Sequence, residues 1–370
     1  MKKPVYLCVL LVFLQTHIAC STNQTTEEDP TTEFKVVTIV DGLDVPWGMD
    51  WLPDGRMLVT ERSGKVLVIE NDVKTGELSG LPEVYDKNQG GLLDVQVHPD
   101  YENNGWIYFS YSKPGDGGAS TAIMRAKLEG NALVSQEVIY ESFPKTRSGV
   151  HFGSRIVFDD KGFIFFSIGE RGEKENAQKL ENPYGKVHRL HDDGRVPEDN
   201  PFVSDPEASH SIWTYGNRNI QGMAFHPASG ELYSHEHGPQ GGDELNIMKK
   251  GENYGWPEVT YGVDYGGGVI SDETTKPGIK DPIHYWDPSI APSGMTFVNS
   301  DRYPKWKNNI LLGALKFQYL CRVVIENGKY VKEAKLLEGI GRVRDVAQSP
   351  DGYIYVAVDG GKIVKLVPED

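Results

Sequence analysis

The sequence has few cysteines: Cys8, Cys20 and Cys321 are the only three among 370 residues. Cys8 lies in an N-terminal apolar run and Cys20 follows soon after it, so Cys321 stands alone in the rest of the chain. A disulfide needs a pair of cysteines, which excludes a disulfide framework for the main body of the protein. We expect Cys321 to be a buried strand residue.

Long hydrophobic runs are also missing. The apolar run at residues 5–14 has ten residues, whereas a membrane-spanning helix needs about 20. Lys2 and Lys3 precede this run, and small residues lead into Cys20. The pattern predicts an export signal of the lipoprotein type over residues 1–19, with Cys20 as the lipidated first residue. An ordinary cleaved signal with an incidental cysteine is the alternative.

Residues 20–33 are polar and acidic and show no periodicity. They predict a flexible tether ahead of a folded domain over residues 34–370. We therefore expect an exported protein that is periplasmic or anchored in the outer membrane, with the N-terminal lipid as its only contact with the membrane.

Positive charge is scarce. The chain has 38 Lys and Arg against 53 Asp and Glu, a net charge of −15, and no basic stripe. This composition argues against nucleic acid as a partner. The sequence also lacks a phosphate-binding loop, a dinucleotide fingerprint, a Gly-x-Ser-x-Gly elbow and a haem-attachment motif, so nicotinamide and flavin cofactors are not expected. The sequence remains compatible with a redox cofactor that is anionic, planar and not a nucleotide.

No long segment has helical periodicity. Instead, two short apolar strands around a polar turn recur six times, and the 41 Gly and 22 Pro suit the many turns. The copies span residues 49–60, 95–110, 155–169, 222–235, 294–314 and 345–358. Their spacing predicts an all-β fold, a six-bladed β-propeller of four-stranded antiparallel blades. Residues 34–40 are placed to close the ring by joining residues 361–367 in the last blade.

Propellers bind ligands at the axis, where loops from several blades converge, so site residues should be scattered along the sequence. His151 lies in a loop just before a strand, and a neutral imidazole there could accept a proton from a sugar hydroxyl. A structural histidine in a loop is the competing interpretation.

The segment 234–244 (SHEHGPQGGDE) contains two histidines and three carboxylates around a Gly-Pro turn. His235 and His237 would suit a transition metal, whereas the carboxylates and exposed carbonyls suit calcium better. A polar loop whose side chains bond one another is the alternative.

Basic residues follow the strands of several blades. These are Arg218 beside Asn219, then Lys316, Arg342 and Arg344. Each alone is ordinary, but together they would grip a ligand with several carboxylates. Gln89 could bond a carbonyl, and Tyr254, Trp256 and Tyr265 could stack on a planar ring or simply pack.

Eight segments, in a fixed order from residue 45 to the C-terminus, resemble the soluble PQQ-dependent aldose sugar dehydrogenases of the glucose/sorbosone dehydrogenase family. The segments are PWGMDWLPDGRMLVTER, QGGLLDVQVHPDY, HFGSRIVF, YGNRNIQGMAFHP, HEHGPQGGDELN, NYGWPEVTYG, SIAPSGMTF and RVRDVAQSPDGYIYV. Each is weak alone, and the ordered set is specific. The resemblance implies a six-bladed propeller, in agreement with the repeat count.

The resemblance implies that aldoses are oxidised to lactones, with His151 accepting the proton of the anomeric hydroxyl while a hydride passes to pyrroloquinoline quinone (PQQ). Residues matched to PQQ binding are Gln89, Arg218, Asn219, Tyr265, Lys316, Arg342 and Arg344. The carbonyls of Gly238 and Pro239 match ligands of the calcium that polarises the quinone. Glu244 and Tyr254 match ligands of a second, structural calcium, with Asp243 as a possible helper. The electron acceptor would be a membrane quinone or a cytochrome.

Two positions depart from the family pattern. Val150 replaces a carboxylate that orients the base in glucose-specialised relatives, and Glu170 stands where many relatives have Asp. Two other function classes stay open: a non-catalytic lipoprotein that binds glycans or a protein, and a metal-dependent lactone hydrolase. The hydrolase would need carboxylates and Asn around an axial metal, whereas this motif set is rich in Arg and Lys.

Overall fold

The computed structural model describes residues 33–369 together with Met1. The predicted export signal (1–19), Cys20 and nearly all of the predicted tether (20–33) lie outside the described residues and stay predictions. In the part of the chain that is described, no helix is long and apolar enough to cross a membrane.

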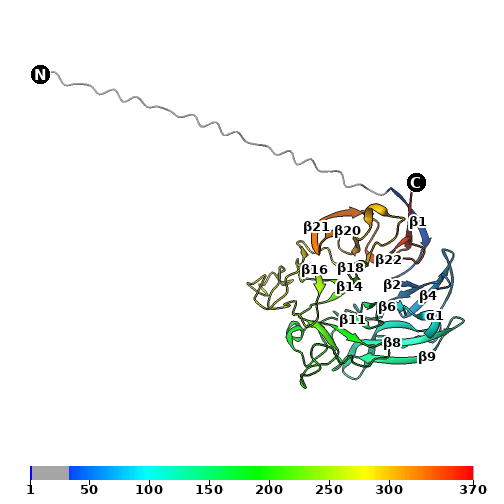
Figure 1. The fold of residues 1–370 in the computed structure, drawn as a ribbon, viewed down its shortest axis with the longest axis horizontal. Coiled ribbons are helices and arrows are strands. Elements are labelled where there is room, and N and C mark those ends of the chain that lie inside the picture. Colours follow the sequence, from blue (N-terminus) through cyan, green and yellow to red (C-terminus); the bar gives the residue numbers. More distant parts are fainter. Residues whose placement is uncertain (2–32, 370) are drawn as a thin grey trace. The chain divides into compact units, whose positions relative to one another are not determined.

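Residues 34–368 form 24 strands in six four-stranded antiparallel sheets arranged in a ring, which confirms the predicted propeller (Figure 1). Blade 1 contains β2 (Pro46–Trp51), β3 (Met57–Glu61), β4 (Lys65–Glu70) and β5 (Val73–Glu77). Blade 2 contains β6 (Leu92–Val97), β7 (Ile107–Gly115), β8 (Gly118–Glu129) and β9 (Ala132–Glu141). Blade 3 contains β10 (Ile156–Phe158), β11 (Ile164–Ile168), β12 (Lys186–Leu190) and β13 (Ile212–Tyr215).

The remaining blades follow the same plan. Blade 4 contains β14 (Ile220–Phe225), β15 (Leu232–Glu236), β16 (Asp243–Met248) and β17 (His284–Trp286). Blade 5 contains β18 (Pro292–Phe297), β19 (Ile310–Ala314), β20 (Tyr319–Glu326) and β21 (Lys329–Leu336). Blade 6 contains β22 (Val343–Gln348), β23 (Ile354–Val358), β24 (Ile363–Pro368) and β1 (Phe34–Val40). Short helical turns are α1 (Tyr101–Asn104), η1 (Lys174–Gln178) and η2 (Pro304–Trp306).

The six sequence repeats are the first two strands of the six blades, and the insertion in the fifth copy contains η2. The first strands of neighbouring blades pack against one another around the axis. The N-terminal strand β1 pairs antiparallel with β24, with Phe34 opposite Pro368, so the two ends of the domain share blade 6 as the sequence predicts. This pairing closes the ring and removes two free strand edges.

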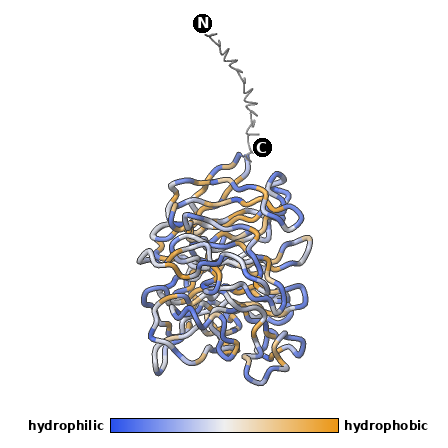
Figure 2. Tube along the Cα trace, turned by 90° about the vertical axis from the view of Figure 1, so that its left-hand side faces the viewer, coloured by the Kyte–Doolittle hydropathy of each residue, from blue (hydrophilic) through white to orange (hydrophobic). Residues whose placement is uncertain are grey.

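The core lies between the faces of adjacent blades. Leu58 of blade 1, for example, belongs to one buried cluster with Val95 and Phe109 of blade 2. Cys321 is fully buried in the cluster shared by blades 4 and 5, as expected from the sequence. Figure 2 shows the same distribution, with apolar stretches inside the domain and hydrophilic turns at its edges. The apolar faces thus hold the blades together and leave the loops free to build a site.

Hydroxyl groups also tie the first four blades to one another. Ser110 Oγ donates to the carbonyl of Ser154 at 2.6 Å, and Ser167 Oγ donates to that of Ile220 at 3.3 Å. Thr60 makes the equivalent bond to Leu93. In each case a side chain of a second strand satisfies a carbonyl at the start of the next blade's first strand, which fixes the loops around the axis.

Candidate active site

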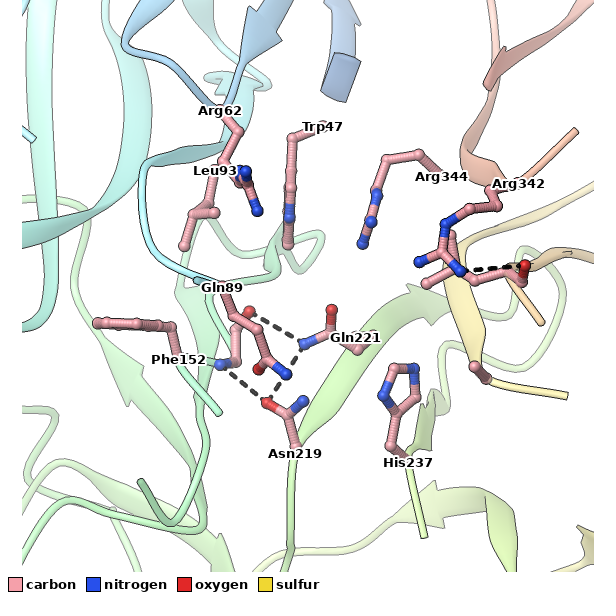
Figure 3. A pocket seen from close by; sticks show the side chains of 13 residues that line it. Trp47, Arg62, Gln89, Leu93, Phe152, Asn219, Gln221, His237, Arg342 and Arg344 are labelled. Carbon is pink, nitrogen blue, oxygen red and sulfur yellow. Dashed lines mark hydrogen bonds between the residues drawn. The ribbon is translucent and has the colours of Figure 1, made fainter. Parts of the chain in front are cut away.

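A cavity of about 230 Å³ lies at the axis, and all six blades contribute to its wall. Figure 3 shows side chains from several directions pointing into this hollow, with Trp47 and Arg344 on one side of it and Asn219 and His237 on the other. The lining residues are Trp47, Arg62, Gln89, Leu93, Phe152, Gly153, Asn219, Gln221, His237, Ala291, Leu315, Arg342 and Arg344. The site is therefore built from residues up to 297 positions apart in the sequence, Trp47 and Arg344 being the most distant pair.

Four of the predicted cofactor-binding residues line this cavity: Gln89, Asn219, Arg342 and Arg344. Arg218 lines a small neighbouring hollow together with Gly238, Glu244 and Tyr254. Lys316 directly follows the lining residue Leu315 and is exposed. Tyr265 is 70% exposed and does not line the cavity.

His151 is held beside the cavity by two polar contacts. Its backbone N–H donates to Oε1 of Gln89 at 2.7 Å, and its Nδ1 lies 2.9 Å from Oε2 of Glu170. Its φ of 55° is in the left-handed region, a strained geometry that is typical of functional sites. A Cβ on Gly169 would lie 2.3 Å from the carbonyl oxygen of His151, so only glycine fits there.

Burial lowers the pKa of His151, and the adjacent carboxylate of Glu170 offsets part of this effect. The imidazole is therefore neutral at pH 7 and can accept a proton at Nε2 while Nδ1 faces Glu170. The Glu170 carboxylate therefore orients the imidazole ring of His151. Val150, which directly precedes His151, has no carboxylate and cannot do so. Arg171 supports the same loop by donating to the carbonyls of Ser148 and Val150.

The wall of the cavity is positive. Arg342, Arg344 and Arg62 line it, and no carboxylate is among the lining residues. Asp359 accepts two hydrogen bonds from Arg344, at 2.9 and 2.7 Å, and lies 3.4 Å from Nε of Arg342. One carboxylate thus positions two guanidinium groups without neutralising both, which suits an anionic ligand.

The Gly-Pro turn predicted to bind calcium is shaped by Asp243. Asp243 Oδ1 accepts the backbone N–H of Gly238 at 2.9 Å, and its Oδ2 accepts Ser289 Oγ at 2.7 Å and the N–H of Ala291 at 2.8 Å. The carboxylate is thus fully used in holding the turn. Any metal at this turn would depend on the carbonyls of Gly238 and Pro239.

The histidines of the same segment are not brought into a metal site. His237 Nε2 lies 2.7 Å from the carbonyl of Pro292 and the residue lines the axial cavity, whereas His235 is completely buried. Within residues 33–369, no group of three or more His, Cys, Asp and Glu side chains is arranged to hold a metal. Calcium at the carbonyls of Gly238 and Pro239 stays a prediction.

Two buried carboxylates face each other next to that turn. Glu236 and Glu244 are direct neighbours across β15 and β16. Burial raises the pKa of Glu236 to about 7. Burial and the charge of Glu236 raise the pKa of Glu244 to about 8. Such a pair is costly when ionised unless a cation neutralises it, so the residues present fit a bound calcium.

Tyr254 lies beside this pair but does not point its hydroxyl at it. The hydroxyl donates to the carbonyl of Ile247 at 2.7 Å and accepts the N–H of Lys249 at 2.8 Å. A contribution of Tyr254 to a metal site would therefore come from its backbone carbonyl.

Among the polar and aromatic side chains of the site, six escaped the sequence analysis as site residues: Trp47, Arg62, Phe152, Gln221, His237 as a wall residue, and Glu170 as the partner of the base. A signal existed for Arg62, because it follows the second strand of its blade as Lys316 does in blade 5. Glu170 is 19 positions from His151, and no local pattern relates the two.

The model of the glucose/sorbosone dehydrogenase family matches residues 43–365 of this chain. Aldose sugar dehydrogenase YliI of Escherichia coli is 41% identical over 345 residues, which cover 90% of this chain and 93% of that protein. Quinoprotein glucose dehydrogenase B of Acinetobacter calcoaceticus is 27% identical over 413 residues, covering 88% and 85%.

Solved structures agree with these sequence matches. The apo-form of the soluble aldose sugar dehydrogenase of E. coli superposes with a TM-score of 0.88 at 39% identity, over 91% of this chain and all of that chain. The PQQ-bound aldose sugar dehydrogenase of Streptomyces coelicolor gives 0.73 at 26% identity, over 92% of this chain and all of that chain. With its propeller, its axial cavity and these matches, the chain belongs to the glucose/sorbosone dehydrogenase family.

Proposed function

We propose that this protein is a PQQ- and calcium-dependent aldose sugar dehydrogenase that oxidises the anomeric carbon to a lactone. The observation that carries the proposal is the pairing of a neutral, carboxylate-oriented His151 with an arginine-walled cavity at the propeller axis. The names of the relatives support the substrate class, and a PQQ-bound relative supports the cofactor.

The cavity fits an anionic planar cofactor such as PQQ, which carries three carboxylates. Arg62, Arg342 and Arg344 offer guanidinium groups to those carboxylates, and Trp47 offers an aromatic face. Gln89, Asn219, Arg218, Lys316 and Tyr265 remain the further proposed contacts, with Tyr265 needing its loop to move because it is exposed here. When bound, PQQ supplies the two-electron acceptor that the protein itself lacks, and calcium at the carbonyls of Gly238 and Pro239 supplies a Lewis acid.

The protein's own part in the reaction is the transfer of a proton. His151 Nε2 accepts the proton of the anomeric hydroxyl as the hydride leaves the same carbon, so the sugar loses two electrons and two hydrogens and becomes a lactone. The imidazolium that forms is stabilised by Glu170 at Nδ1, 2.9 Å away. The buried position of both groups keeps water from competing for the proton.

The test is dye-coupled oxidation of a panel of aldoses by purified cofactor-free protein, with PQQ and calcium added or withheld. We expect activity only with both, a loss of at least about 100-fold in His151→Ala, and unchanged PQQ binding in that variant. His210→Ala, at an exposed histidine on another loop, is the matched control. Absence of oxidation and of PQQ binding would contradict the proposal and favour a propeller that only binds glycans or proteins.

Export also stays a proposal. We infer a lipoprotein signal over residues 1–19 with lipid on Cys20, and a quinone or a cytochrome as electron acceptor. Cys20→Ala should move the protein from the membrane fraction to the soluble periplasmic fraction, and an unchanged distribution would argue against lipidation.

A further inference from the structure

A second cavity of about 560 Å³ opens between blades 4 and 5, more than twice the volume of the axial cavity. Its wall is formed by β17, the segment that follows it, the turn between β19 and β20, and β21. We call it the blade 4–5 cleft and define it by Tyr285, Trp286, Phe317, Tyr319, Glu333 and Lys335. Its volume is in the range of small-molecule sites, about 300–1,000 Å³.

Aromatic rings dominate the surface of the cleft. Phe317 is 46% exposed and Tyr285 is 44% exposed, whereas Trp286 and Tyr319 are buried beneath them. The ring of Tyr285 stacks on Tyr261 with 3.9 Å between centroids, so its orientation is fixed before any ligand arrives. Exposed, rigid aromatic faces are typical of binding sites, and they match the apolar C–H faces of pyranose rings.

Polar groups stand between these rings. Glu333 Oε2 accepts the indole N–H of Trp286 at 2.7 Å, which leaves the other carboxylate oxygen for a ligand. Nε2 of His284 is buried, lies 3.8 Å from the same carboxylate, and makes no hydrogen bond to any described residue. Lys335 at the rim faces the ring of Tyr319 at 5.3 Å. A ligand rich in hydroxyl groups could bond the free oxygen of Glu333 and the ammonium group of Lys335, whereas Nε2 of His284 is buried out of its reach.

The charge of the cleft narrows the ligand class. Asp287, Glu333 and Glu338 line it against a single cation, Lys335. Burial lowers the pKa of His284, so this residue adds no positive charge at pH 7. A negatively charged glycan or a nucleic acid would be repelled, and a neutral polyhydroxylated ligand would not.

The cleft is continuous in sequence with the axial cavity at two points. Ile290 lines the cleft and Ala291 lines the axial cavity. Leu315 lines the axial cavity and Phe317 lines the cleft. A chain-like ligand with one end in the axial cavity can therefore continue over the rim formed by these two segments.

We propose that the blade 4–5 cleft binds the non-reducing part of a neutral oligosaccharide whose reducing-end unit occupies the axial cavity. This proposal rests on the proposed function for the position of the reducing end, because only that unit has a free anomeric hydroxyl. The cleft then makes short oligosaccharides, rather than free monosaccharides, the better substrates.

The first experiment measures binding without chemistry. Cofactor-free protein is titrated, by calorimetry and by tryptophan fluorescence, with borohydride-reduced trisaccharides of four types: malto-, cello-, manno- and galacto-linked. These alditols have no anomeric carbon to oxidise. We expect at least one to bind, with Kd about tenfold higher in Phe317→Ala and in Tyr285→Ala. Phe143→Ala, at a 60% exposed Phe that follows β9 in blade 2, is the control and should bind like the wild type.

The second experiment uses the loaded enzyme. Phe317→Ala should raise KM about tenfold for the unreduced trisaccharide that binds best, with no change for its monosaccharide. If no sugar is oxidised but the alditol binds in the cleft, the proposed function is wrong, whereas the assignment of the cleft as an oligosaccharide-binding site is supported. If monosaccharides are oxidised but no alditol binds, or the variants bind it equally, the cleft proposal is overturned. Self-association that Phe317→Ala abolishes, without alditol binding, would overturn it in favour of a protein contact.

Discussion

Arg155 joins five of the six blades at the axis, and its removal should destabilise the whole propeller. Its Nη1 lies 2.9 Å from Oδ1 of Asp94 and 3.3 Å from Oδ1 of Asp345. Its Nε donates to the carbonyl of Gln221 at 3.1 Å, and its guanidinium lies 4.4 Å from the ring of Trp47. Arg155 itself precedes β10 of blade 3, so these contacts reach blades 1, 2, 4 and 6.

The change Arg155→Met keeps most of the volume and removes the charge. Asp94 is fully buried and Asp345 is 3% exposed, so both carboxylates would lose their cation inside the protein. Breaking a buried ion pair by removing one partner costs about 3–5 kcal/mol. Asp94 keeps a hydrogen bond from the N–H of Ile156 at 2.8 Å, and Asp345 keeps one from the N–H of Met49 at 3.1 Å. Because these bonds still stabilise both carboxylates, we expect a loss of stability in the upper part of this range, and not twice as large for the two ion pairs together.

The loss of stability in Arg155→Met should become larger as pH rises. Burial already raises the pKa of Asp345 to about 7, with Arg155 opposing the shift, and burial also raises the pKa of Asp94. Without Arg155 both values rise further, so the folded variant binds protons more tightly than the unfolded chain. Its stability relative to the wild type then falls as pH rises, by up to about 1.4 kcal/mol per pH unit for each carboxylate.

Urea unfolding at pH 5.5 and pH 8.0, followed by fluorescence and circular dichroism, measures this directly. The double variant Arg155→Met with Asp345→Asn should recover part of the loss at pH 8.0, because one uncompensated charge is gone. Arg56→Met, which removes a surface pair with Asp54, is the control and should cost no more than about 1 kcal/mol. A loss below about 1 kcal/mol in Arg155→Met, or an equal loss at both pH values, would refute the reasoning.

Three further predictions concern the base, the cofactor wall and acid stability. Glu170→Gln should lower kcat at least tenfold and shift the acidic limb of the kcat–pH profile to lower pH, because the carboxylate raises the pKa of His151; an unmoved profile would contradict the contact. Asp359→Asn should raise the Kd for PQQ about tenfold by releasing Arg344, measured by equilibrium titration, and an unchanged Kd would show that Arg344 holds its position unaided. Burial lowers the pKa of His188 to about 3, so its contribution to stability is complete above pH 6.5 and is lost as pH falls below it, by about 1.4 kcal/mol per unit. The midpoint of thermal unfolding between pH 4 and 7 should vary less in His188→Gln than in the wild type, and equal slopes would exclude His188 as the cause.

The sequence by itself determined the fold. Two-residue periodicity in each repeat specifies strands, and the number of repeats specifies blades, because each copy supplies the first two strands of one sheet. The joining of residues 34–40 to the last blade also followed from pattern, since an unpaired strand edge at each end of a ring needs a partner. Cys321 was expected to be a buried strand residue, and it lies buried in β20.

Only the tertiary structure decided how the site is put together. The contact of Glu170 with His151 depends on a loop that Arg171 and Gly169 shape, and the facing of Glu236 and Glu244 depends on the register of β15 and β16. Trp47 and Arg62 of blade 1 line the cavity beside Arg342 and Arg344 because closure of the ring makes blades 1 and 6 neighbours. A sequence repeat fixes which residues form each strand, but the distance between side chains of different blades is set by packing around the axis, and no local pattern records it.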